Sequence, residues 1–189
     1  MRGEKKRTNG QIVYTAFLQA LIKQSGVTIK ELSERIGITT TSMQHWFRSD
    51  DVNLKRVLQV SQELGYRFLI CLNPRTGAKE KEPVFFSPSE LTQFDIKRLH
   101  FLAKAMKDRH ITKKAMAESI GIRREAVTYW FTYDDITMRN LVTCAQLLDM
   151  DILIRFERNV SVADESRTGI KIQSSVSDTL SWLVEEEQA

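Results

Sequence analysis

The stretch that decides the fold is GITTTSMQHWFRSDD, residues 37–51, which returns 84 positions later as GIRREAVTYWFTYDD, residues 121–135. Sliding the chain on itself by 84 residues aligns 17–70 with 101–154 without a gap, and 17 of the 54 aligned pairs are identical. A gapless match of this length indicates two copies of one structural unit. We call residues 17–70 the first repeat and 101–154 the second repeat, and we expect each to form a domain.

Apolar spacing and boundary residues predict four helices and a strand in each repeat. Thr28 with Glu31 makes a capping box, and Gly37 can take the positive φ found at helix ends. After the fourth helix the apolar residues alternate, as they do in strands. The predicted helices are 11–25, 28–36, 40–48 and 53–64, then 95–109, 112–120, 124–132 and 138–148; the predicted strands are 66–72 and 151–156.

The expected fold is therefore mainly α, with two strands. A lone edge strand is a liability, so we expect 67–72 to pair with 152–157 in a small antiparallel sheet, which would make the chain an internal pseudo-dimer. In the tail we expect a strand at 169–173 and a short helix within 177–187, serving as a dimer contact, a partner site or simple self-packing. The expected organisation is a basic N-terminal arm (1–9), a first domain (10–73), a linker (74–87), a second domain (88–157) and an acidic, partly helical tail (158–189).

The composition, 42% hydrophobic and 28% charged, is that of a soluble globular protein. No apolar run approaches the roughly 20 residues that span a bilayer, so no membrane partner is expected. The basic start lacks the apolar segment of a secretory signal, which predicts a cytoplasmic protein. Cys71 and Cys144 are expected to be buried free thiols.

The net charge of +4 is unevenly spread. Residues 157–189 hold three basic and seven acidic residues, while residues 1–156 hold 25 basic and 17 acidic ones. A basic body with an acidic tail suggests a polyanionic partner, although a soluble protein with a charge fluctuation would look the same.

A helix, a glycine turn and a second helix, with apolar residues at fixed offsets, form the helix-turn-helix pattern. Around Gly37 the pattern includes Leu32, Met43 and Trp46, and around Gly121 it includes Met116, Val127 and Trp130. With these residues the sequence resembles the lambda-repressor-like (XRE-type) family of DNA-binding domains in both copies, over roughly residues 10–65 and 94–149.

The resemblance implies that the third helix of each repeat enters a major groove, where its outer face contacts bases. The implied base contacts are Thr40, Thr41, Gln44, His45, Arg123, Arg124, Thr128 and Tyr129. Cations near helix starts and on the third helix are expected to contact phosphates, namely Lys30, Arg48, Lys55, Arg56, Lys113, Lys114 and Arg139.

Two acidic pairs, Asp50–Asp51 and Asp134–Asp135, depart from the family pattern, because acids near the DNA backbone would repel phosphates. Two alternatives remain open for them: they favour the N-terminus of the fourth helix, or they pair with basic residues of the other copy.

We therefore expect a sequence-specific double-stranded DNA-binding protein, a bacterial or phage transcriptional repressor, acting as an internal pseudo-dimer or as a homodimer through its strands or tail. The alternative is a helix-turn-helix fold reused as a protein–protein adaptor, as in an antitoxin or a virion component. The sequence does not support an enzymatic function. It shows no nucleophile–His–acid set, no carboxylate pair and no phosphate-binding glycine loop. Neither a cofactor nor a metal site is expected, because the three histidines and two cysteines lack ligand spacing.

Overall fold

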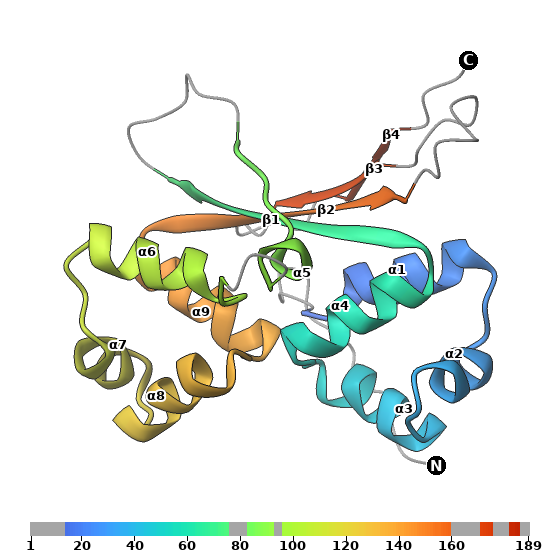
Figure 1. The fold of residues 1–189 in the computed structure, drawn as a ribbon, viewed down its shortest axis with the longest axis horizontal. Helices are drawn as coiled ribbons and strands as arrows, with labels where there is room; N and C mark the ends of the chain where they lie inside the picture. The colour runs from blue at the N-terminus through green and yellow to red at the C-terminus, as the bar shows by residue number, and fades with distance from the viewer. Residues whose placement is uncertain (1–13, 76–82, 93–95, 160–170, 176–181, 186–189) are drawn as a thin grey trace, which may run out of the picture.

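The computed structural model describes residues 14–75, 83–92, 96–159, 171–175 and 182–185. In these residues the protein is mainly helical and has a small antiparallel sheet, and the helices lie on one side of that sheet (Figure 1). The predicted arm, half of the linker and most of the tail lie outside the described residues. The first half of the chain forms α1 (Ala16–Ser25), α2 (Ile29–Arg35), α3 (Thr40–Ser49), α4 (Leu54–Glu63) and β1 (Tyr66–Pro74).

The second half repeats this order after one short helix. It forms α5 (Pro88–Leu91), α6 (His100–Asp108), α7 (Lys113–Ile120), α8 (Arg124–Tyr133), α9 (Met138–Leu147) and β2 (Met150–Arg158). The last two strands are β3 (Lys171–Ser175) and β4 (Trp182–Glu185).

Local capping fixes several of these helix ends. The predicted capping box is present at the start of α2, where the Thr28 hydroxyl accepts the Glu31 N–H at 3.2 Å and the Glu31 carboxylate accepts the Thr28 N–H at 2.9 Å. These hydrogen bonds to the charged carboxylate lower the pKa of Glu31. Gly37 follows α2 with a φ of 68°, a left-handed conformation that glycine adopts without the steric penalty of a side chain.

The first helix of each repeat begins later than predicted. Residues 97–99 precede α6 in a turn rather than in the helix predicted from 95, because the N–H groups of Arg98 and Leu99 donate to the Asp134 carboxylate at 2.8 and 2.9 Å. At the start of α1, the Thr15 N–H and hydroxyl donate to Asp50 in the same way. An acid at the end of the third helix therefore sets where the first helix begins.

The predicted pairing of the two strands is confirmed. β1 and β2 are antiparallel, and Arg67 faces Glu157 while Leu72 faces Ile152. The sheet is larger than expected, since β3 pairs with β2 and β4 pairs with β3.

The helix predicted within 177–187 is wrong for residues 182–185, which form β4. A run of three apolar residues, Trp182 to Val184, is too short for periodicity to separate a helix from a strand. Hydrogen bonding to the neighbouring strand therefore decides its conformation.

The two repeats are related by a pseudo-twofold axis. Ile70 faces Ile154 in the β1–β2 ladder, and Asn53 forms an isolated antiparallel bridge with Thr137. Both pairs are separated by 84 residues, so each joins a position to its own repeat equivalent, as happens only on a twofold axis. The bonds across the second pair are also reciprocal: Leu54 N–H donates to Ile136 C=O and Met138 N–H to Val52 C=O, both at 2.8 Å.

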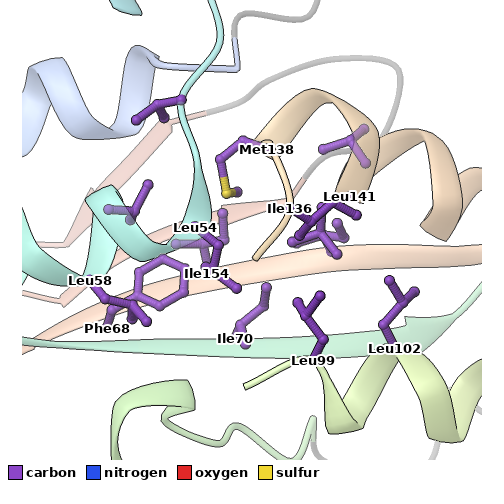
Figure 2. Close-up of a cluster of buried hydrophobic side chains, with 14 of the residues drawn as sticks. Leu54, Leu58, Phe68, Ile70, Leu99, Leu102, Ile136, Met138, Leu141 and Ile154 are labelled. Carbon is purple, nitrogen blue, oxygen red and sulfur yellow. The ribbon is translucent and has the colours of Figure 1, made fainter. Parts of the chain in front are cut away.

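A single hydrophobic core draws on both repeats (Figure 2). Leu54, Phe68 and Ile70 from the first half lie close to Ile136 and other side chains from the second half. Each large apolar side chain that is fully buried stabilises the fold by about 1.5–3 kcal/mol. The repeats are therefore joined by apolar burial as well as by the sheet.

Candidate nucleic-acid interface

The third helices, α3 and α8, lie on the side of the molecule opposite the sheet (Figure 1). The pseudo-twofold axis places them at corresponding positions, one on each side of the α4–α9 junction. All of the predicted base-contact residues except Thr40 are exposed, namely Thr41, Gln44, His45, Arg123, Arg124, Thr128 and Tyr129.

Apolar residues fix the inner faces of these helices. Met43 of α3 and Val127 of α8 are fully buried, and Trp130 is only 7% exposed. Trp46, the repeat equivalent of Trp130, is half-buried against the same core. Positions that are apolar in both repeats therefore hold the helices, and the predicted contact positions, whose residues differ between the repeats, lie mainly on the outer faces.

Thr40 differs from the other predicted contact residues. It is half-buried, and its hydroxyl oxygen lies 3.0 Å from that of the fully buried Ser33 on α2. This hydrogen bond joins α2 to α3, so the Thr40 hydroxyl serves the packing of the two helices.

An exposed aromatic pair on α8 was not predicted from the sequence. Tyr129 and Tyr133 are 58% and 62% exposed, and their ring centroids lie 4.1 Å apart. The spacing of four residues, which puts two side chains on one helical face, was the signal that could have identified Tyr133. The corresponding residues of α3 are His45 and Ser49, so the two outer faces differ in chemistry as well as in charge.

The predicted phosphate contacts fall into three groups. Lys30, Arg48 and Lys55 are exposed, and none of them forms an ion pair within the described residues. In the second repeat, the Lys113 ammonium lies 4.9 Å from the centre of the Phe131 ring and Lys114 is 3.8 Å from Glu118. Arg56 and Arg139 lie at the junction between the repeats.

The Asp pairs at the ends of α3 and α8 have internal partners. The second acid of each pair reaches the fourth helix of the other repeat: Asp51 accepts the Arg139 N–H at 3.1 Å, and Asp135 accepts the Lys55 N–H at 3.0 Å. Each of these acids therefore caps the N-terminus of a fourth helix, as the first alternative expected. That helix belongs to the other copy, as the second alternative expected. These exchanged caps hold α4 and α9 together at the axis.

Arg139 completes this junction. Its guanidinium donates to the Ser49 carbonyl at 2.8 Å and lies 5.3 Å from the centre of the Tyr14 ring. The side chain thereby links the start of α9 to the end of α3, so its charge is already engaged within the protein.

Removing one exchanged cap should loosen the helix of the opposite repeat. Asp135→Ala is expected to lower the free energy of unfolding by about 1–2 kcal/mol, as the loss of a helix cap does. Hydrogen exchange should quicken at the Lys55 amide, although residues 55 and 135 are far apart in sequence. Asp108→Ala, which removes only an exposed ion pair with Lys104, should change stability by less than about 0.5 kcal/mol. Unchanged exchange at Lys55 in Asp135→Ala would contradict the capping role.

The described part of the chain lacks the groups that several other kinds of site require. No group of three or more His, Cys, Asp or Glu side chains there could hold a metal ion. Both cysteines are buried and free, and burial raises the pKa of Cys144 to about 12, which keeps that thiol protonated. Among the described helices, none has the length and apolar character needed to cross a membrane.

Comparison of the chain with models of known protein families, with curated proteins and with solved structures found no match.

Proposed function

We propose that the protein binds double-stranded DNA in a sequence-specific way through the outer faces of α3 and α8, and acts as a transcriptional repressor. The observation that carries this proposal is the placement of two exposed, polar third helices on one side of a pseudo-twofold molecule (Figure 1). A DNA duplex presents its major groove twice on one face, about 34–36 Å apart, to proteins that dock two such helices.

The proposal includes a helix-turn-helix role for α2–α3 and for α7–α8, as the resemblance to the lambda-repressor-like family implies. In each pair a left-handed glycine follows the first helix, and a buried apolar residue anchors the second. The outer faces carry side chains suited to base edges, since Gln matches adenine and Arg matches guanine in bidentate geometry.

The acidic pairs do not weigh against DNA binding. Asp50 and Asp134 accept hydrogen bonds at the starts of α1 and α6, and Asp51 and Asp135 cap α9 and α4. Acids held in this way stabilise the junction and are partly neutralised by the N–H groups that they face.

Binding to duplex DNA should depend strongly on salt. If about six phosphates are neutralised, the logarithm of the binding constant should fall with the logarithm of salt concentration with a slope near −5. Lys30→Ala should reduce the slope by about 1 and weaken binding to all sequences alike. Fluorescence anisotropy across a salt series measures both quantities. A complex that does not respond to salt would reject the proposal.

The two halves of the DNA site should differ in sequence. Arg124→Ala is expected to weaken binding by about 1–3 kcal/mol and to relax the preference in one half-site only. Gln44→Ala should affect only the other half-site, and therefore serves as the matched control. Selection from random duplexes with each variant would locate the half-sites, which we expect about 10 base pairs apart. A perfect palindrome changed equally in both halves by either variant would contradict this arrangement.

The second candidate is a protein–protein adaptor, which the exposed Tyr129–Tyr133 pair favours. Aromatic side chains are enriched at protein interfaces, where they contribute much of the binding energy. If this candidate is correct, Tyr133→Ala would abolish binding to a protein partner, and no duplex would be retained at low salt.

A further inference from the structure

The outer face of α8, on the side of the molecule opposite the sheet, carries two neighbouring stripes of exposed side chains (Figure 1). Residues four positions apart on a helix lie on the same side, one turn after another. The first stripe is polar, and the second has an acid followed by two aromatic rings. The stripes are Arg124, Thr128 and Thr132, and Glu125, Tyr129 and Tyr133.

The two rings of the second stripe contact each other, and we call them the tyrosine pair. The centroids of the Tyr129 and Tyr133 rings lie 4.1 Å apart, and the ring planes are inclined by 37°. Each ring therefore limits the rotation of the other, although both are exposed. Side chains that are ordered before binding lose less conformational entropy when they bind. The pair is thus a preorganised apolar surface.

This apolar surface is small, and its neighbours on the helix are polar. The other large apolar side chains that are exposed in the described residues lie on other elements, namely Val84, Ile96 and Leu147. A stable protein interface needs a broader apolar core, since it buries about 800 Å² on each partner. A thymine base offers a better match, because its C5-methyl group is a single apolar feature among hydrogen-bonding groups at the major-groove edge.

The first repeat has no counterpart of the tyrosine pair. The repeat equivalents of Tyr129 and Tyr133 are His45 and Ser49, and the Ser49 hydroxyl donates to the His45 carbonyl at 2.8 Å. Helix α3 therefore presents polar groups at the positions where α8 presents rings. A contact that depends on these rings is confined to the part of a ligand that faces α8.

We propose that Tyr129 recognises thymine by packing its ring against the C5-methyl group, in the half-site that α8 reads. Tyr133 is a positioning residue, which holds the Tyr129 ring through their mutual contact. Arg124 and Thr128, on the neighbouring stripe, hydrogen-bond adjacent base edges. Burial of one methyl group strengthens binding by about fourfold. This inference rests on the proposed function and adds the chemistry that distinguishes the two half-sites.

The experiment replaces thymine by uracil, which forms the same base pair and lacks only the methyl group. The full-length protein first selects its site from random duplexes, and Arg124→Ala identifies the half-site that α8 reads. Deoxyuridine then replaces thymidine in one half-site at a time, and fluorescence anisotropy at constant salt measures each affinity. In the α8 half-site, the replacement should weaken binding by about fourfold for each methyl group that the ring contacts.

Variants of the tyrosine pair show whether the rings are responsible for this loss, which we call the uracil effect. Tyr129→Phe keeps the ring and should keep the uracil effect, whereas Tyr129→Ala should bind the thymine and uracil duplexes with equal affinity. Tyr133→Ala should reduce the effect, and Tyr133→Phe should restore it. Ser49→Ala, at the repeat equivalent of Tyr133, is the matched control and should leave the effect unchanged. Thermal melting checks that each variant is folded.

The possible failures of this inference and of the proposed function can be told apart. If the wild-type protein binds no duplex at low salt, the proposed function is rejected and this inference with it. Duplex binding with no uracil effect in the α8 half-site, or a selected α8 half-site without thymine, would overturn this inference alone. A uracil effect that persists in Tyr129→Ala would do the same. Unchanged duplex affinity in Tyr129→Ala would also overturn it and would assign the pair to a protein partner.

Discussion

Trp130→Ala is expected to lower the free energy of unfolding by about 3–5 kcal/mol, because it removes a large aromatic side chain from the core. The indole is 7% exposed and anchors α8 to the core shared by both repeats. Alanine would leave a cavity that the surrounding side chains fill only in part. Urea unfolding followed by circular dichroism measures the change. Because the core is shared, we expect one cooperative transition in the variant.

Matched variants on α3 and α8 serve as controls for this change. Trp46→Ala removes the same side chain from the equivalent position of α3, where it is half-buried, and should therefore cost less than Trp130→Ala. Gln44→Ala and Thr128→Ala, on the exposed faces, should change stability by no more than about 0.5 kcal/mol. If Gln44→Ala destabilised the protein as much as Trp130→Ala does, the assignment of inner and outer helix faces would be wrong.

Asp134→Ala should cost about 2–4 kcal/mol, because it removes several interactions at once. Its carboxylate accepts the Arg98 and Leu99 N–H groups and pairs with the Arg98 guanidinium at 3.3 Å, and the side chain is only 14% exposed. The residue also has a φ of 55°, a left-handed conformation that Asp and Asn tolerate better than alanine. Thermal or urea unfolding checks the magnitude.

Asp134→Asn separates these contributions. Asparagine tolerates the same backbone conformation and keeps one side-chain oxygen, so about half of the loss should be recovered. Asp50→Ala is the matched change in the first repeat, where the carboxylate accepts the Thr15 N–H and hydroxyl and forms no ion pair within the described residues. It should therefore cost less than Asp134→Ala. Full recovery of stability in Asp134→Asn would mean that the carboxylate, with its charge and second oxygen, is not the cap of the first helix.

Much of the fold could be predicted because its signals are local or repeated. The capping box at Thr28 needs only residues 28–31, and the glycine at position 37 needs only its own backbone. The register of the β1–β2 pairing could also be predicted. When two equivalent segments pair about a twofold axis, only a few registers are possible. The confirmed pairs Arg67–Glu157 and Leu72–Ile152 follow from that constraint.

The parts that could not be predicted depend on residues far apart in the chain. The start of α6 is set by Asp134, which lies 36 residues after Arg98 in the sequence. The exchanged caps join Asp51 to Arg139 and Asp135 to Lys55, and neither partner carries a local sign of the other. The hydrogen bond between Ser33 and Thr40 is nearer in sequence, but it depends on how α2 packs against α3, which no local pattern indicates. On the candidate interface, helix geometry alone indicated which side chains face outward.

The covalent joining of the two repeats has a genetic consequence. In a protein that pairs two identical subunits, a single codon change alters both recognition faces at once, and any loss of binding is doubled. In this chain a codon change in α8 leaves α3 untouched, while the caps and the β1–β2 ladder keep the two faces in the same relative orientation. Under the proposed DNA binding, one face could therefore change its sequence preference while the other kept its own. The differences between the Gln44–His45 and the Thr128–Tyr129 faces are the kind of divergence that this freedom permits.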